Sequence, residues 1–563
     1  MNSTSYLKVR CVILAVLTAV SIAMHPHETW ALASNNIPID SPVYYCLEKL
    51  VSFGLIQDDF KGIRPISKAE AARLLLKAEE IIAKANEIPK PQIGPEYTVT
   101  YRNYPVAEQP SLANEMIEEL RHLLEREISL RDNPESAPLF DARPVSEARV
   151  RYVYLNGAPR SYDRLVHDPG GDGVFGIGAG LRPDNPPGFT IHQRGTEGTP
   201  LMENNEGVTY ARKNNAEVRF SSEAFISSYV SALVEPMFLY TQTGEVVQGR
   251  VNKGYAKLGG GGIELEVGRD ANWLGLGDRQ AITLTNNAVN FDLVKLSSPE
   301  PIDIRYLGKL KYSFIFSRFD DTVTTGVERR PWFLAAKVSV KPIPEIEIGL
   351  NLGRQMGGPG VDNSAGAIIK GLVGGLNNDN SNSLAGLELR VRIPFLRNTE
   401  IYGEFSGEDA AAFFPIVDSY VGGIFIPRLT EDGKNDFRFE YFFGNNILYS
   451  NTTFPGGYLY RGMPIGSSQG GATQDFFFRY RHWFSMRHNA ALEYFHTDRG
   501  KTGRIAGQSV EEKNSWRALW NFPLYDRFDA GLMYGWEKVN NFDLVAGVKQ
   551  INQLARIDLT YRY

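Results

Sequence analysis

Apolar and polar residues alternate one by one over most of this chain, from about Ala148 to its end. In one such segment, Leu387 and Leu389 flank the charged residue Glu388. Successive side chains of a β-strand point to opposite faces, so a segment of this kind has one apolar and one polar face. Segments with this pattern lie at 148–154, 215–222, 225–235, 262–269, 310–317, 333–341, 346–352, 387–393, 399–406, 420–427, 436–443, 474–483, 488–496, 513–521 and 526–537. The pattern predicts a mainly β structure with turns rich in Gly, Asn and Asp.

A soluble β-sandwich would alternate as well, but three features favour a transmembrane barrel. The polar faces carry full charges, as a polar lumen requires, and aromatic residues lie at strand ends, as in membrane girdles. The last residues, 557–563, alternate up to a terminal aromatic residue, as in the signal that directs barrels to the outer-membrane assembly machinery. At about 23 residues per strand and turn, the roughly 415 residues after Ala148 give about 18 strands. We therefore expect a transmembrane antiparallel β-barrel over 146–563, in contact with outer-membrane lipid.

The first 33 residues have the layout of a secretory signal peptide. Lys8 and Arg10 precede an apolar run over 11–24, and 31–33 read Ala-Leu-Ala, a suitable cleavage site. The apolar run of about 14 residues is shorter than the roughly 20 that a spanning helix needs. We predict export and cleavage of residues 1–33.

Residues 34–135 show helical spacing instead. Ser41 and Pro42 suit the start of one helix, and Ser67 with Glu70 forms a capping box at the start of a second. A third helix is expected from about Ser111. The charged faces of these helices suit water and not lipid. The sequence predicts a helical domain in the periplasm, attached to an outer-membrane barrel.

Composition excludes several other classes of protein. The 60 basic and 65 acidic side chains leave a net charge of -5, so there is no basic field for nucleic acid. Cys46 is the one cysteine after the signal, so no internal disulfide is expected. The histidines form no cluster with ligand spacing, and the chain lacks a phosphate-binding loop, so we predict no metal and no cofactor.

Several loops carry residues suited to sugars. Polysaccharide binding uses aromatic faces against C–H surfaces, and amides, carboxylates and arginines against hydroxyl pairs. The candidates are Trp273, Asp278, Arg279, Asn286, Asn287, Asn378, Asn380, Asn382, Glu408, Asp409, Tyr460, Arg461 and Gln469. Each is also explained by turn formation or by an aromatic girdle, without any ligand.

A glycosidase pair is the enzymatic alternative. Glu404, Glu408 and Asp409 lie close in sequence, and hydrolysis needs two carboxylates about 5–10 Å apart. Glu404 alternates with Tyr402 on a predicted strand, which makes it an inward, solvated carboxylate. We do not expect an enzyme.

Many short segments, in order, resemble the Wzi-type capsule assembly family of outer-membrane proteins. They are 40–44, 64–75, 254–258, 264–270, 273–277, 286–288, 294–297, 330–332, 357–360, 378–386, 402–404, 460–462 and 470–471. The family's usual paired Trp appears here as Asn272-Trp273, and Leu276 stands where Pro is common. The resemblance implies a barrel of roughly 18 strands, most readily with an occluded lumen, and a periplasmic helical bundle. It implies a role in attaching or organising capsular polysaccharide at the cell surface.

A porin is the alternative function. The helical segment, with Tyr44-Tyr45, 53–55 and 67–75, also resembles an S-layer-homology-like module, and such modules precede porin barrels and grip peptidoglycan-linked polymer. The two hypotheses differ in ion conductance, which a porin shows and a plugged barrel does not.

Overall fold

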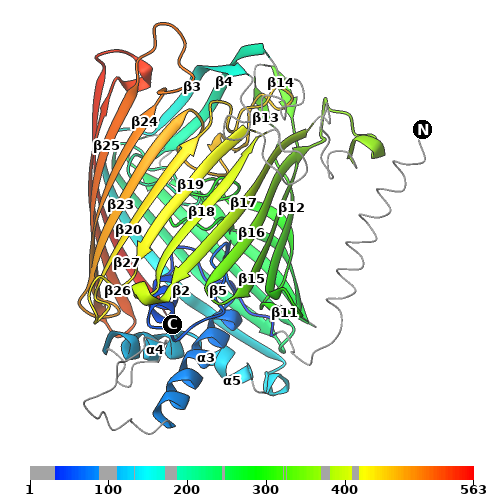
Figure 1. The fold of residues 1–563 in the computed structure, drawn as a ribbon, viewed down its shortest axis with the longest axis vertical. Coiled ribbons are helices and arrows are strands. Elements are labelled where there is room, and N and C mark those ends of the chain that lie inside the picture. Colours follow the sequence, from blue (N-terminus) through cyan, green and yellow to red (C-terminus); the bar gives the residue numbers. More distant parts are fainter. Residues whose placement is uncertain are drawn as a thin grey trace.

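The strands close into a single barrel (Figure 1). The computed structural model describes residues 32–87, 111–131, 133–170, 187–243, 247–260, 262–320, 322–324, 326–368, 381–408 and 417–562. Within these residues, 18 long antiparallel strands pair in chain order around the ring, and the last pairs with the first, with Val150 opposite Leu559. They are β2 (Phe140–Asn156), β5 (Lys213–Ile226), β6 (Val230–Thr241), β7 (Val247–Gly260), β8 (Ile263–Asp270), β10 (Phe291–Ser297), β12 (Gly308–Arg318), β15 (Trp332–Ile343), β16 (Ile346–Met356), β17 (Ser381–Ile393), β18 (Thr399–Glu408), β19 (Val417–Ile426), β20 (Asn435–Gly444), β23 (Thr473–Trp483), β24 (Asn489–Arg499), β25 (Glu511–Tyr525), β26 (Phe528–Asn540) and β27 (Lys549–Arg562). The predicted barrel is confirmed, although β2 begins before residue 146.

The alternation in sequence sets which face of each strand points outward. On β17, Leu389 is 48% exposed on the outside, whereas Glu388 and Arg390 are buried on the inside. On β10, Val294 and Leu296 point outward in the same way. The barrel therefore has an apolar outer belt and a charged inner wall, as predicted. Glu388 and Arg390 are paired as well as buried, Glu388 with Lys337 and Arg390 with Asp59.

The two ends of the barrel differ. The helical end carries α3 (Lys68–Glu87), α4 (Ser111–Leu123) and α5 (Glu125–Arg131), and its strand connections are short, such as 344–345 (Figure 1). The loop end carries the long connections, including the hairpin of β3 (Arg160–Gly170) and β4 (Pro187–Gly198). The short strand β11 (Ile302–Ile304) pairs with β12 in the barrel sheet. Separate two-stranded sheets are formed by β13 (Thr322–Thr324) with β14 (Val327–Arg329) and by β21 (Leu459–Tyr460) with β22 (Met463–Pro464). None of the helices in the described ranges is long and apolar enough to cross a membrane.

The helix starts agree with the sequence only in part. The Ser67 hydroxyl accepts a hydrogen bond from the Glu70 backbone amide at 3.1 Å, as a capping residue should. The Glu70 carboxylate does not return this bond, because it pairs instead with Lys311 on β12. The predicted capping box is therefore wrong in its second half. The reason is that Lys311 is buried on the barrel wall and needs an opposite charge, which the equally buried Glu70 supplies.

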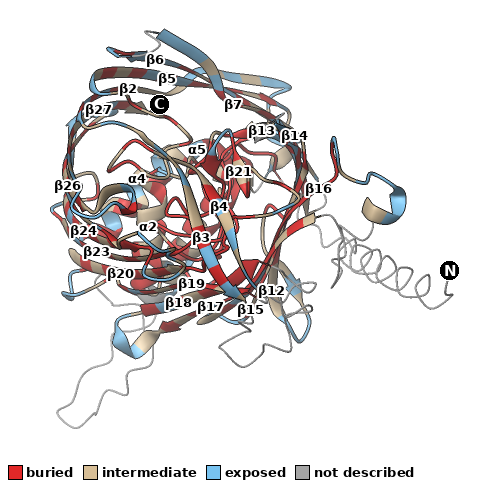
Figure 2. Ribbon diagram, turned by 90° about the horizontal axis from the view of Figure 1, so that it is seen from above, coloured by how far each residue is buried: buried red, intermediate tan, exposed pale blue. Residues whose placement is uncertain are grey.

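Residues 32–66, which we call the plug, lie inside the barrel, and α2 (Val43–Ser52) is their helix (Figure 2). Lys49 of α2 is buried and pairs with Asp436 on β20 at 2.9 Å. Asp59 pairs with Arg390 at 2.8 Å and with Lys341 at 3.1 Å. The expectation that the charged helix faces meet water is wrong for this segment, since its charges meet opposite charges on the barrel wall.

A second segment also turns into the lumen. Residues 271–290, the inner loop, connect β8 to β10, and their strand β9 (Trp273–Leu274) pairs with β1 (Ile63–Arg64) of the plug. Leu274, Ile282 and Leu284 of this loop are buried in a core that includes inward residues of β10, β12 and β15. Burying these aliphatic side chains holds the inner loop inside the barrel. The plug and the inner loop together occupy the lumen.

Candidate functional site

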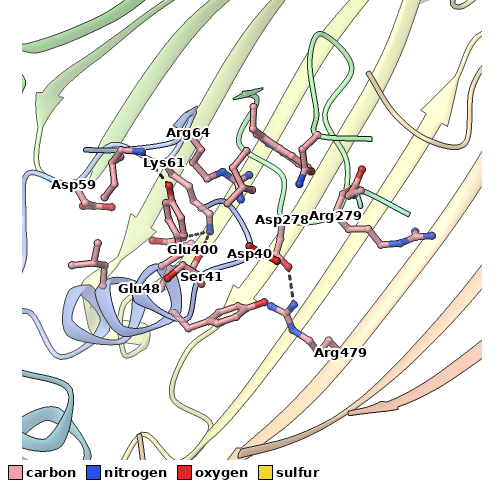
Figure 3. A pocket seen from close by; sticks show the side chains of 18 of the residues that line it. Asp40, Ser41, Glu48, Asp59, Lys61, Arg64, Asp278, Arg279, Glu400 and Arg479 are labelled. Atoms are coloured by element: carbon pink, nitrogen blue, oxygen red, sulfur yellow. Dashed lines mark hydrogen bonds and ion pairs between the residues drawn. The ribbon is translucent and has the colours of Figure 1, made fainter. Parts of the chain in front are cut away.

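Two of the larger cavities among the described residues contain residues that the sequence analysis selected. The first, the inner chamber, has a volume of about 280 Å³ and lies between the plug, the inner loop and the barrel wall (Figure 3). The second, the outer cleft, has a volume of about 340 Å³. It lies at the loop end, between the β3–β4 hairpin and the connection 445–472 that joins β20 to β23.

Four predicted residues of the inner loop line the inner chamber: Trp273, Asp278, Arg279 and Asn286. The Asp278 carboxylate lies 2.8 Å from Arg479 and 3.6 Å from Arg438. Figure 3 shows Asp278 pointing toward Arg479 across the chamber. Burial tends to raise the pKa of Asp278, but the two guanidinium groups outweigh it and hold the pKa well below its usual range. Asp278 is therefore a charged anchor for the inner loop.

The other charges of the chamber are neutralised in the same way. Arg279 pairs with Glu203 at 2.8 Å and also with Asp475. Trp273 is buried, and the guanidinium group of Arg64 lies 4.5 Å from its ring centre, a cation–π contact. The carboxylates lining the chamber (Asp40, Glu48, Asp59, Glu70, Glu203, Asp278, Glu400, Glu493) nearly balance its cations (Lys61, Arg64, Arg279, Arg390, Arg479, Arg517, Arg556). The chamber thus has no strong excess of either charge.

Four more predicted residues are buried and bonded to other parts of the chain. Asn287 donates to the Pro464 carbonyl at 3.0 Å, and Asn382, which lies on β17, donates to Gln355 at 3.1 Å. Glu408 accepts from the Tyr449 amide at 2.7 Å. Gln469 is buried beside Arg499 at 3.3 Å. Asn378, Asn380 and Asp409 lie outside the described residues.

Tyr460 and Arg461 are the predicted residues that the structure brings to the outer cleft. Arg461 lines the cleft, and its side chain is 46% exposed. Tyr460 is buried behind it, and its hydroxyl lies 3.3 Å from Asp320, which also pairs with Arg461 at 2.6 Å. These two residues join the cleft to the aromatic interior of the barrel.

An aromatic cluster supports the cleft. Phe319, which lines it, stacks on Phe333 with a centroid distance of 4.9 Å and lies the same distance from Tyr460. Phe291 meets all three rings edge-on or tilted, at 5.4 to 5.7 Å. Offset and edge-on pairs of this kind are favourable and restrict ring motion. The apolar wall of the cleft is therefore firmly packed.

The sequence analysis missed most of the cleft. Its lining is Ser161, Arg194, Gly195, Thr196, Phe319, Arg329, Pro331, Gln355, Phe454, Gly456, Gly457, Leu459, Arg461 and Gly462. These residues come from segments far apart in the chain, so no local spacing unites them. The signal that was available is the glycine-rich run around 456–462, which contains Arg461.

Comparison with known proteins assigns this chain to a family. The family model of the capsule assembly protein Wzi matches residues 182–554. The chain belongs to the Wzi capsule assembly family. The matched range covers most of the barrel, and the plug lies before it.

Two relatives are similar to this chain. One is a solved structure of Wzi from Escherichia coli, described as an outer-membrane protein involved in group 1 capsule assembly and as a carbohydrate-binding β-barrel. It is 15% identical in sequence to this chain. The match has a TM-score of 0.62 and covers 93% of this chain and 99% of that one. The likeness shows a shared fold. The other is an uncharacterised 55.8 kDa protein from the cps region of Klebsiella pneumoniae, 25% identical over 134 residues, or 23% of this chain. That match spans only 26% of the relative's length.

Proposed function

We propose that this protein is an outer-membrane barrel that binds capsular or related surface polysaccharide and holds it during capsule assembly. In this proposal the loop end faces the cell exterior, and the helical end faces the periplasm. Long connections at one end and short ones at the other are the usual arrangement of outer-membrane barrels, with the long loops outside. Membership of the Wzi family supports the capsule assignment.

The outer cleft is the observation that carries the proposal. Its lining combines the largely buried aromatic side chains of Phe319 and Phe454 with hydroxyl, amide and guanidinium groups. Sugars present both C–H faces and hydroxyl pairs, so a site for them needs this mixture. The cleft lies among the long loops, where an extended polymer has access without entering the barrel.

The proposed role is non-catalytic. Glu404 and Glu408, the carboxylates considered as a hydrolytic pair, are both buried and do not line the cleft. Glu404 lies 3.2 Å from the Ile282 amide, and Glu408 lies 2.7 Å from the Tyr449 amide. Carboxylates held by backbone amides inside a packed lumen serve to fix the inner loops.

A deletion strain tests the proposal. We expect the strain to lose cell-associated polysaccharide into the medium and to regain retention when the gene is supplied on a plasmid. Staining and sedimentation of surface polysaccharide give the readout, and total polymer synthesis is the control. Normal retention in the deletion strain would overturn the proposal.

A further inference from the structure

Two neighbouring turns at the helical end of the barrel bring two arginines close to each other (Figure 1). Residues 394–398 join β17 to β18, and residues 427–434 join β19 to β20. The Nη1 atom of Arg397 donates a hydrogen bond to the Leu429 carbonyl at 2.7 Å, so the two turns are in contact. Their side chains therefore share one stretch of the barrel rim.

The two turns begin where the apolar outer belt ends. Ile401 on β18 and Ile424 on β19 lie opposite each other and are exposed on the outside of the barrel. Ile426 ends β19, and Arg428 follows it by two residues. Because lipid headgroups lie at the edges of the apolar belt, Arg428 is close to their level.

The charge of Arg428 has little compensation from the protein. This arginine takes part in none of the ion pairs found in the described part of the chain, and its Nε atom is buried without a hydrogen-bond partner. Its guanidinium group lies 5.4 Å from the ring centre of Phe53. Burial and the neighbouring charge of Arg397 lower the pKa of Arg428. An anion bound by both arginines would relieve their repulsion.

Two carboxylates of the second turn leave most of this positive charge in place. Asp432 accepts hydrogen bonds from the Thr430 hydroxyl at 2.5 Å and from the Lys434 amide at 3.0 Å, so it serves its own turn. Glu431 lies 3.9 Å from Arg397, and its side chain is 93% exposed. An exposed ion pair of this length contributes little, so a ligand anion can displace Glu431 readily.

Exposed apolar side chains flank the two arginines. Phe395 is 80% exposed, and Leu396 and Leu429 near it are exposed as well. Ile343 and Phe484, at the turns on either side, continue this apolar rim. Water disfavours such large apolar side chains, whereas acyl chains accept them. The rim therefore suits a ligand with an anionic head and apolar tails.

We propose that Arg397 and Arg428 together bind the phosphate of an anionic phospholipid, whose acyl chains lie against the exposed apolar rim. Two guanidinium groups can share the oxygens of one phosphate through charge-assisted hydrogen bonds. A zwitterionic lipid offers the same phosphate but adds an ammonium group, which the arginines repel. The inference takes only its orientation from the proposed function: with the helical end toward the periplasm, this rim meets the inner leaflet of the outer membrane, which consists of phospholipids.

The test measures lipid binding to the full chain in detergent micelles. Dioleoylphosphatidylglycerol and dioleoylphosphatidylethanolamine form a matched pair, because they share acyl chains and phosphate and differ in the net charge of the head. We expect native mass spectrometry of the titrated micelles to show at least about fivefold tighter binding of phosphatidylglycerol. Equal affinity for the two lipids would overturn the inference.

Variants locate the binding. Arg397→Gln and Arg428→Gln should each weaken binding of phosphatidylglycerol at least about fivefold and leave binding of phosphatidylethanolamine nearly unchanged. Phe395→Ser should weaken binding of both lipids alike, because it removes contact with the acyl chains and no charge. Arg305→Gln is the matched control, since Arg305 also lies in a turn at the helical end, with its guanidinium group 4.9 Å from the ring centre of the exposed Tyr306. Heat-modifiable gel migration shows that each variant has folded. Equal loss of binding in Arg305→Gln and Arg428→Gln would mean that any arginine of the rim attracts the lipid, which overturns the site.

Two further ligands identify the source of the phosphate. Inorganic phosphate lacks acyl chains, so a millimolar concentration should not displace phosphatidylglycerol, and displacement would overturn the lipid assignment. Tighter binding of lipopolysaccharide than of phosphatidylglycerol, lost in Arg428→Gln, would place this rim in the outer leaflet and overturn the inference. Capsule retention in the deletion strain is measured separately, so failure of the lipid selectivity would leave the proposed function standing.

Discussion

Glu48 of the plug offers a quantitative test of how the plug is held. Its carboxylate lies 2.7 Å from Lys61 and accepts a hydrogen bond from Arg438 on β20 at 2.9 Å. Arg438 is fully buried. Replacement by Gln keeps the shape of the side chain and removes its charge, so Arg438 is left with Asp278 at 3.6 Å.

The size of the effect follows from the pKa. Burial tends to raise the pKa of Glu48, but Arg438 and Lys61 outweigh it and lower the pKa from 4.5 to about 2. At about 1.4 kcal/mol per unit of pH, this amounts to roughly 3 kcal/mol of stability. Removing one partner of a buried ion pair costs about 3–5 kcal/mol in other proteins, which agrees. We expect Glu48→Gln to lower the free energy of unfolding by roughly 3 kcal/mol at pH 7.

The pH dependence provides an internal check. The pKa is lower in the folded state, so the charged carboxylate stabilises the fold above about pH 4.5, and this stabilisation is lost as the pH falls toward 2. The difference between wild type and variant should therefore be largest at pH 7 and shrink on acidification.

The assay is guanidinium unfolding of refolded protein in detergent micelles, followed by tryptophan fluorescence at several pH values. Glu118→Gln is the control, because Glu118 is exposed on α4. A difference below about 1 kcal/mol at pH 7 would be typical of an exposed pair. That result, or a difference that stays constant with pH, would refute the reasoning.

Three further predictions concern the lumen and the plug. Because the plug and the inner loop occupy the lumen, purified protein in a planar bilayer should give no steady conductance of porin size; stable porin-like steps would contradict this. Gly277→Ala should destabilise the inner loop by about 1–3 kcal/mol, as overpacking does. The reason is that an added Cβ would lie 1.9 Å from the Gln280 carbonyl oxygen. Unchanged thermal stability would show that the loop relaxes to accept the extra atom. The Cys46 thiol is buried, and burial raises its pKa, so a thiol reagent should modify it only after unfolding; rapid modification of the folded protein would mean that α2 leaves the lumen.

The sequence predicted the barrel well because alternation is a local signal. The outward position of Leu389 and the inward position of Glu388 follow directly from the spacing of two. The capping of α3 by the Ser67 hydroxyl was also predicted from neighbouring residues, and its hydrogen bond to the Glu70 amide is present. The prediction failed where partners are distant in sequence, as with Glu70 and Lys311.

The candidate site was less predictable for the same reason. Trp273 and Asn286 were selected as loop residues open to a ligand, yet both are buried in the lumen. The apolar residues Ile282 and Leu284 in the same segment were the available sign that it packs inward. The outer cleft joins Arg194 to Arg461, and only proximity in the folded barrel reveals such a pair.

The contacts of the plug also constrain the order of assembly. The plug precedes the barrel in the chain, but its ion pairs reach Arg390 on β17 and Asp436 on β20, far downstream. Forming contacts across so many residues costs loop-closure entropy early in folding. These ion pairs can therefore form only after the downstream strands have formed. Until then, the plug of an exported chain must remain without its contacts to the barrel wall. Seating of the plug would then report that a barrel has been correctly completed.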